Sequence, residues 1–410
     1  MKSIITHSTI MTALTFLTFA GLAAAQYSNS VGGALPAGID APMTSGFSNP
    51  TVQPSRGGAA ICVSGHVPVM ASAENVMFNF SIPANESDVT DTFLKYITQG
   101  STFAQSIMGG MHNVSGNYSI GATLCMPANG TIPSSVQLLT HGIGFDRYYW
   151  DFAAGYSYVD YAIEQGYATF SYDRLGVGLS STPDPIQVVQ GPLEVSIANQ
   201  LATSLRNSKF GGANFSTVIG VGHSFGSAIT QAVTSMHATT FDAAILTGFS
   251  MNQTAIPAFV TALNLQIASQ NQPYRFAGLN NGYLVDYSAV SNQYGFFRAP
   301  NFDPLILAAG EAAKGSVTFG ELFTQAAIAS PAMNFTGPVA IVNGAADLPF
   351  CFGNCSYPMN LAEAAVNALY PASMAKDNYL APSTGHGVNL HYTAMDAYKF
   401  IGSFLKQSRY

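Results

Sequence analysis

The sequence predicts an α/β protein with a mostly parallel sheet, helices on both faces and an inserted helical cap. Short apolar runs of strand length alternate with stretches of helical periodicity from about residue 136 to the C-terminus. Strands that alternate with helices in this way form parallel sheets covered on both faces. The alternation stops between Thr247 and Val339, where about ninety residues contain helical pieces without a clear strand. A structureless loop of that length is improbable, so these residues predict a cap over the sheet.

The N-terminus has the three parts of a secretory signal peptide. Lys2 supplies a positive charge, an apolar stretch runs from about Ile10 to Ala20, and Ala23–Ala25 offers a small-residue cleavage site. We therefore predict a signal peptide over residues 1–25, a mature chain that begins at Gln26, and a secreted, extracellular protein. The alternative is a membrane anchor, which the shortness of the apolar stretch disfavours.

The next part of the chain has mixed character. Residues 26–57 are rich in Gly, Pro, Ser and Asn without periodicity, which predicts an extended N-terminal arm. Residues 59–80 predict extended segments, and residues 87–108 carry apolar side chains near helical spacing. A strand is expected at about 118–126.

The predicted core covers residues 58–250 and 334–410, and the predicted cap covers residues 251–333. The later core strands are the apolar runs Val136–Thr140, Ala168–Tyr172, Thr217–Val221, Ala243–Thr247, Val339–Val342 and Asn378–Leu380. Core helices are expected at 151–164, 192–206, 227–233, 360–369 and 392–406, and cap helices at 258–267, 304–313 and 319–329. Eight aromatic residues between Tyr274 and Phe302 are interpreted mainly as the core of the cap itself. The alternative is that some of them line an apolar pocket.

The chain carries little charge. Only 9% of its residues are charged, compared with about 25% in an average globular protein, and the net charge is −7. Without a basic stripe, nucleic acid is not an expected partner. Nine Asn-x-Ser/Thr sequons predict surface glycosylation sites in an exported chain. They lie at Asn79, Asn85, Asn113, Asn117, Asn129, Asn214, Asn252, Asn334 and Asn354.

Four cysteines in an exported chain predict two disulfides. Of the three possible pairings we favour Cys62–Cys125 and Cys351–Cys355. The first two lie in strand-like segments that can be neighbours, and Gly353 allows a tight loop between the second two. A zinc site is the alternative, but the cysteine spacings match no zinc pattern.

The pentapeptide Gly222–Gly226, with sequence Gly-His-Ser-Phe-Gly, follows an apolar run and precedes a helical run. Strand, Gly-x-Ser-x-Gly and helix in this order are typical of a nucleophile elbow. The turn is tight, so glycine on either side of Ser224 has a steric reason, and the helix N-terminus favours negative charge. The alternative is a chance glycine-rich turn.

A serine nucleophile needs a histidine base, which a carboxylate orients. His386 lies between two glycines on a loop after the last strand. The runner-up, His391, falls at the start of the final helix. His223 is adjacent to the serine in sequence, so its side chain is expected to point elsewhere. The order serine, acid, histidine favours His386.

The carboxylate should follow a late strand. Asp347 comes directly after Val339–Val342, among small residues that suit a tight turn, and lies between the serine and the histidine in the chain. A turn aspartate that caps its own backbone is the alternative interpretation. Asp303 and Asp286 are alternative acids, but both fall inside the predicted cap.

An oxyanion needs two backbone donors. One should come from the residue after the nucleophile, Phe225, and the second from an early strand-to-helix loop. The glycine-rich segment His141–Gly144 follows a predicted strand, and Ile143 is the candidate for the second donor.

Together these motifs resemble the α/β-hydrolase superfamily over about residues 59–406. The segment Asp173–Ser180 adds to the resemblance, because it is similar to the Asp-x-x-Gly-x-Gly-x-Ser loop that follows a core strand in such enzymes. The resemblance implies an eight-stranded, mostly parallel sheet with a cap between strands six and seven. The export signal, sequons and low charge are similar to those of a fungal secreted member. The N-terminal arm, the helical excursion at 87–108 and the cysteine loop after Asp347 depart from the pattern.

The residues that flank the serine resemble those of serine esterases and lipases. Epoxide hydrolases of the superfamily use aspartate as the nucleophile, so Ser224 argues against that reaction. The resemblance implies hydrolysis of a small-molecule ester or lactone with a bulky apolar group, with no cofactor, no metal and no stable membrane anchor. Acyl transfer or lactone formation by the same triad is an alternative. Another is a binding protein that has kept the fold without catalysis.

Overall fold

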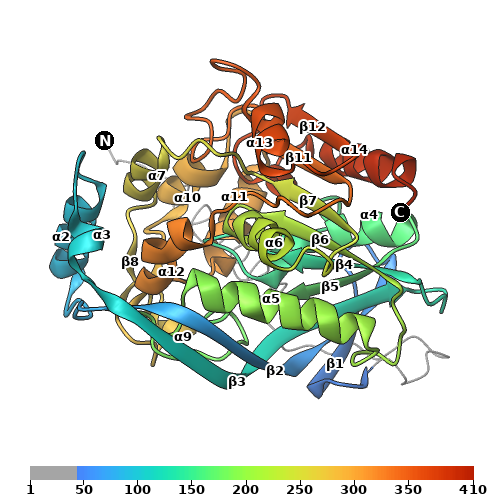
Figure 1. Ribbon diagram of the computed structural model, residues 1–410, viewed down its shortest axis with the longest axis horizontal. Helices are drawn as coiled ribbons and strands as arrows, with labels where there is room; N and C mark the ends of the chain where they lie inside the picture. The colour runs from blue at the N-terminus through green and yellow to red at the C-terminus, as the bar shows by residue number, and fades with distance from the viewer. Residues whose placement is uncertain (1–43) are drawn as a thin grey trace, which may run out of the picture.

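The computed structural model describes residues 44–410, and the expected signal peptide and cleavage site lie outside these described residues. At the centre is a nine-stranded sheet with the order β1-β2-β3-β5-β4-β6-β7-β11-β12 (Figure 1). The strands are β1 (Ser48–Pro54), β2 (Ala60–Phe78), β3 (Met108–Pro127), β4 (Ser135–Thr140), β5 (Ala168–Tyr172), β6 (Thr217–His223), β7 (Ala243–Thr247), β11 (Val339–Gly344) and β12 (Lys376–Ala381). From β5 to β12 in this order, neighbouring strands are parallel, which confirms the predicted fold class.

The strand β1 is a ninth strand, beyond the eight that the resemblance implies. It pairs antiparallel with β2, with Val52 opposite Val63. Most of its residues are exposed, so it lacks the alternation of apolar and polar side chains from which a strand can be predicted. Part of the segment expected to be an extended arm is therefore an edge strand.

The strands β2 and β3 form a hairpin of 19 and 20 residues that is much longer than the sequence indicates. Between them, the single helix predicted over 87–108 is divided into α2 (Glu86–Ile97) and α3 (Phe103–Ser106). Gly100 lies between these helices with a φ of 75°, a left-handed conformation that a continuing helix cannot contain. This excursion lies beside the cap, where Glu86 accepts a hydrogen bond from the backbone of Ile267 (Figure 1).

Helices cover both faces of the sheet. α5 (Gly191–Arg206) and α6 (Phe225–Met236) pack against each other, as do α4 (Tyr158–Glu164) and α14 (Ala394–Gln407), while α13 (Leu361–Leu369) contacts β11 and β12. The central strands are almost entirely buried, as expected for parallel strands covered on both sides.

The elements between β7 and β11, which we call the cap, include three short strands where the sequence predicts only helices. These strands form a small sheet in the order β10-β9-β8. Strands of two or three residues are too short to show a period, which explains why they were not predicted. The cap contains α7 (Ile256–Leu263), β8 (Gln266–Ile267), α8 (Ala268–Asn271), α9 (Pro273–Phe276), β9 (Tyr283–Val285), α10 (Ala289–Phe296), α11 (Pro304–Ala313), β10 (Val317–Thr318), α12 (Phe319–Thr324) and the 3-10 helix η3 (Gln325–Ile328).

The structure forms the two disulfides of the favoured pairing. Cys62 and Cys125 lie opposite each other in the β2–β3 register and are bonded across it. Cys351 and Cys355 close a short loop after β11. Within residues 44–410, no helix has the length and apolar character needed to cross a membrane.

Candidate active site

Ser224 occupies a sharp turn between β6, which ends at His223, and α6, which begins at Phe225. Its backbone has φ 57° and ψ −119°, a conformation that costs energy for any residue other than glycine. A Cβ added to Gly222 would lie 2.4 Å from the carbonyl oxygen of Gly226. A Cβ on Gly226 would lie 2.1 Å from the oxygen of Thr140. Gly222 is therefore required for β6 and α6 to approach this closely, and Gly226 is required for α6 to approach the end of β4.

Ser224, His386 and Asp347 form a continuous chain of hydrogen bonds at the carboxyl ends of the parallel strands. The Ser224 Oγ lies 2.8 Å from His386 Nε2, and His386 Nδ1 lies 2.6 Å from Asp347 Oδ2. The serine is 5% exposed and the other two side chains are fully buried. Asp347 Oδ1 accepts a second hydrogen bond from the Phe350 amide. The three residues come from the elbow and from the loops after β11 and β12, as the sequence predicts.

The runner-up histidine, His391, forms hydrogen bonds with backbone groups and not with Ser224. Its Nε2 accepts hydrogen bonds from the amides of Arg298 and Gly385, and its Nδ1 lies 2.8 Å from the Gly387 oxygen. Burial lowers its pKa to about 4, so it is neutral at physiological pH. His391 thus holds the two glycines on either side of His386 and does not reach Ser224.

His223 does point away from the serine hydroxyl, but it still contacts the site. Its ring stacks on Tyr149 with centroids 4.3 Å apart and lies 4.8 Å from the ring of His386. Its Nδ1 lies 3.1 Å from Thr247 Oγ1. Burial, followed by the proximity of His386, lowers the pKa of His223 well below its usual value. A neutral imidazole therefore packs beside the candidate base, a role that its position in the pentapeptide did not reveal.

The candidate oxyanion loop lies against the serine. A Cβ on Gly142 would be 2.8 Å from the Ser224 Cβ, so only glycine fits there. Ile143 and Phe225 line the same pocket as Ser224. Within the described residues, neither of their amides donates a hydrogen bond to another protein group. Both donors are available to a ligand.

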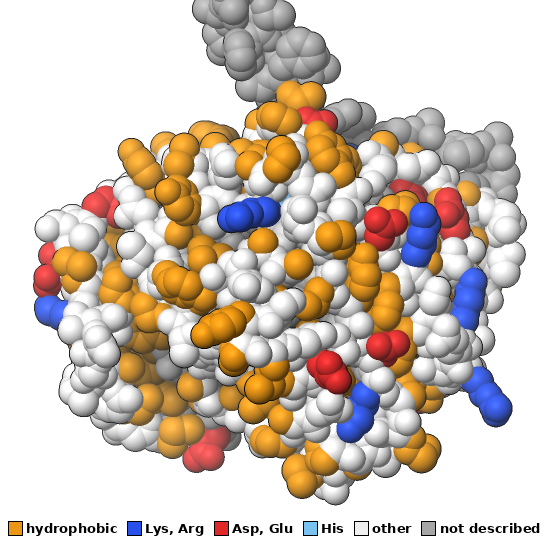
Figure 2. Space-filling view, turned by 90° about the horizontal axis from the view of Figure 1, so that it is seen from above, with side chains coloured by type: hydrophobic (Ala, Val, Ile, Leu, Met, Phe, Trp, Pro, Cys, Tyr) orange, Lys and Arg blue, Asp and Glu red, His pale blue; other side chains and the backbone are white. Residues whose placement is uncertain are grey.

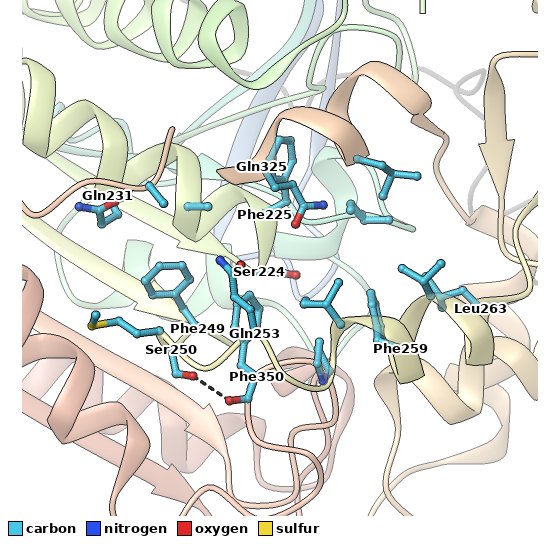
Figure 3. A pocket seen from close by; sticks show the side chains of 18 of the residues that line it. Ser224, Phe225, Gln231, Phe249, Ser250, Gln253, Phe259, Leu263, Gln325 and Phe350 are labelled. Atoms are coloured by element: carbon cyan, nitrogen blue, oxygen red, sulfur yellow. Dashed lines mark hydrogen bonds between the residues drawn. The ribbon is translucent and has the colours of Figure 1, made fainter. Parts of the chain in front are cut away.

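The pocket next to Ser224 is a largely apolar cavity of about 1190 Å³, its mouth included. In Figure 3 labelled lining residues lie on both sides of Ser224, with Gln231 and Phe249 on one side and Phe259 and Leu263 on the other. None of the described residues that line it carries a charge. Within residues 44–410, no group of three His, Cys, Asp or Glu side chains could hold a metal ion.

Tyr96 of α2 also lines this pocket, although no motif in the sequence indicates it. Its hydroxyl donates to the Leu322 oxygen of α12, and its ring packs on Phe323. The helical excursion of the β2–β3 hairpin thus reaches the pocket wall. None of the eight aromatic residues between Tyr274 and Phe302 lines this pocket, to which the cap instead contributes Phe259. Of the eight, Phe276, Tyr283, Phe296 and Phe297 are buried, Phe302 is partly buried, and Tyr274, Tyr287 and Tyr294 are exposed.

The alternative acids lie away from Ser224. Asp303 accepts a hydrogen bond from the Leu305 amide as the N-cap of α11. Asp286 is buried, with Lys314 Nζ 3.8 Å from its Oδ2. Burial raises the pKa of Asp286 from 3.8 to about 7, and the Lys314 charge opposes the shift.

This raised pKa predicts a pH dependence of stability. Between about pH 4 and pH 7 the folded protein keeps a proton on Asp286 that the unfolded chain has lost, so its contribution to stability falls as pH rises. We expect the melting temperature of Asp286→Asn to decline less than that of wild type between pH 5 and pH 7.5. Differential scanning fluorimetry across this range tests the difference, and two parallel curves would contradict it.

Comparison with known proteins assigns the chain to a family. A model of the alpha/beta hydrolase family matches residues 137–398, and no curated protein matches the sequence. A thermophilic esterase from Thermogutta terrifontis is 14% identical, with a TM-score of 0.48 over 72% of this chain and 95% of that one. A metagenome-derived lipolytic enzyme is 12% identical, with a TM-score of 0.46 over 68% and 95%. An epoxide hydrolase from Vigna radiata is 15% identical, with a TM-score of 0.46 over 71% and 95%. Because the matched residues make up more than half of the 410-residue chain, the protein belongs to the alpha/beta hydrolase family.

Proposed function

We propose that the protein is a secreted serine hydrolase that cleaves a carboxylic ester or lactone of a bulky, apolar substrate through an acyl-enzyme. The observation that carries the proposal is the unbroken chain of hydrogen bonds Ser224–His386–Asp347 beside an uncharged pocket. A weak nucleophile, a base within reach and a carboxylate that orients the base are the components of nucleophilic acyl transfer.

In the proposed reaction, Ser224 Oγ attacks the substrate carbonyl carbon while His386 Nε2 takes the hydroxyl proton. The buried carboxylate of Asp347 keeps His386 Nδ1 protonated and stabilises the imidazolium. The amides of Ile143 and Phe225 donate to the oxyanion. His386 then gives its proton to the alcohol that leaves. A water molecule, activated by the same histidine, attacks the acyl-enzyme and releases the acid.

The substrate class follows from the pocket. A cavity without charged lining residues favours a neutral, apolar ligand, because a charged ligand would lose its hydration without compensation. Apolar lining residues on either side of Ser224, such as Phe249 and Phe259, suit an ester with apolar groups on both sides of the carbonyl (Figure 3). In the face shown in Figure 2, charged side chains are scattered among hydrophobic and neutral ones, without a continuous charged patch that would steer an ionic substrate.

Secretion as a glycoprotein of fungal type is part of the proposal. Two disulfides are typical of chains that fold in an oxidising compartment. Of the nine sequon asparagines, eight are exposed and Asn252 is partly buried, so glycans can be accommodated at the surface. Peptide mapping of the secreted protein, with and without enzymatic deglycosylation, tests occupancy at each site.

A fluorophosphonate probe and a panel of neutral esters test the proposed activity. We expect the probe to label Ser224 in the wild type and to leave folded Ser224→Ala unlabelled, with hydrolysis of apolar esters by the wild type alone. Failure of the folded wild type to react with the probe or with any ester would favour a binding protein. If an added alcohol diverts most product from acid to ester, acyl transfer is the better assignment.

A further inference from the structure

We propose that Arg174 and Glu321 position the oxyanion hole and couple it to the cap. The inference rests on the proposed function, because it concerns the donors that this reaction needs. Arg174 follows β5 in the core, whereas Glu321 belongs to α12 in the cap, and both side chains are fully buried. The Arg174 Nη1 donates to Glu321 Oε1, so the pair joins the two parts of the fold at one point.

Arg174 controls the peptide unit that supplies the Ile143 amide. Its Nη2 donates to the Gly142 oxygen at 3.4 Å. In a trans peptide the carbonyl and the following N–H point in opposite directions, so a held Gly142 oxygen sets the direction of the Ile143 N–H. The guanidinium also lies 5.0 Å from the ring centroid of Phe225, the residue of the other oxyanion donor.

Arg174 acts on the same carbonyl through His141. The Arg174 backbone amide donates to His141 Nε2 at 3.0 Å, so Nε2 is the acceptor and the neutral ring carries its proton on Nδ1. That Nδ1 lies 2.8 Å from the Gly142 oxygen and donates to it. The carbonyl therefore has two donors: the Arg174 guanidinium, and His141, whose tautomer the Arg174 backbone amide sets and which the Arg174 variants retain.

Glu321 is itself held by the N-terminus of α12. Its Oε2 accepts from the Thr318 amide at 2.8 Å, and the Glu321 amide donates to Thr318 Oγ1 at 3.1 Å, which completes a capping box. The position of the guanidinium is thus tied to the start of α12.

A second contact between the cap and the oxyanion loop involves Gly144, two residues after Gly142. The Gly315 amide donates to the Gly144 oxygen at 3.0 Å. A Cβ on Gly315 would lie 2.1 Å from the Phe145 oxygen, so the two backbones are in close contact. The cap therefore contacts the loop directly at the Gly144 carbonyl and indirectly, through Glu321 and Arg174, at the Gly142 carbonyl.

Two variants test the pair. Arg174→Met/Glu321→Leu removes both charges of the ion pair together. The buried Glu194, whose pKa burial raises to about 7 against the opposing Arg174 charge, is expected to become neutral when that charge is removed. Arg174→Lys keeps the charge but cannot bond Glu321 and the Gly142 oxygen with the geometry of a guanidinium. In both we expect kcat per titrated site to fall by about 10- to 100-fold, below the roughly 10²–10³-fold loss of a whole oxyanion donor. KM should change little, because the lost interaction forms mainly in the transition state.

The measurement uses a soluble short-chain p-nitrophenyl ester, with active sites titrated by a fluorophosphonate. The inhibition constant of a trifluoromethyl ketone, which forms a tetrahedral adduct, should rise by the same factor as kcat falls. A merely structural role would lower the titrated fraction and leave kcat per site unchanged.

Arg206→Met/Asp242→Leu removes a partly exposed ion pair elsewhere in the protein and serves as the control. Wild-type kcat per site in the double variant or in Arg174→Lys would overturn the inference, whereas an inert wild type would instead reject the proposed function.

Discussion

We expect His386→Ala to lower kcat for ester hydrolysis by about 10⁶-fold, since a nucleophile without its base loses nearly the whole effect of the triad. Among residues 44–410, the Ser224 Oγ is bonded to no other base: His223 is turned to Tyr149 and Thr247, and His391 is bonded to backbone groups. We expect stability to fall as well, because the fully buried imidazole would leave a cavity and Asp347 would lose its partner, so activity is compared per folded molecule. Steady-state kinetics with circular dichroism as a check on folding provide the measurement.

The matched control is His391→Gln. The Gln Oε1 can accept the amide of Arg298 or Gly385 in place of His391 Nε2, so the loop around His386 keeps part of its support. We expect a lower melting temperature and a far smaller loss of kcat than in His386→Ala. Equal losses in the two variants would show that the assignment of the base to His386 is wrong.

Local sequence was sufficient to predict the candidate site because each member lies in a short segment with its own signal. The elbow glycines leave no room for a Cβ, and Asp347 and His386 follow strands that end at the same edge of a parallel sheet. These constraints act within a few residues, so they can be read without knowledge of the rest of the fold. The same reasoning ranks His386 above His391, and in the structure His386 is the histidine that lies beside Ser224.

Features that depend on distant parts of the chain were not predicted. The strand β1 forms by pairing with the edge of β2, a contact that the sequence of β1 alone does not indicate. The strands β8, β9 and β10 are too short to show a period. Tyr96 reaches the pocket only because the long hairpin carries α2 across to the cap. Arg174 belongs to the loop motif Asp173–Ser180, but its partner Glu321 lies 147 residues later. No local pattern indicates such a pair.

Asp347→Asn should lower kcat by about 10⁴-fold while the protein stays folded, because the substitution imposes the wrong tautomer on His386. The Phe350 amide decides the orientation of the new side chain. It donates to Asp347 Oδ1 at 2.9 Å, so the amide oxygen of asparagine must take that place. The NH₂ group then faces His386 Nδ1 and donates to it. A ring that accepts at Nδ1 carries its proton on Nε2 and cannot take the proton of Ser224.

The opposite orientation is excluded because it would set the NH₂ group against the Phe350 N–H, two donors without an acceptor. Asp303→Asn is the matched control: asparagine is an equally good N-cap for α11, so kcat and stability should stay near wild type. Nitrogen-detected NMR of His386 in folded Asp347→Asn can observe the tautomer directly. A protonated Nδ1, or wild-type kcat, would remove Asp347 from the triad. If Asp303→Asn showed the larger loss, the acid would have to be sought in the cap, although no path of hydrogen bonds leads from Asp303 to His386 within the described residues.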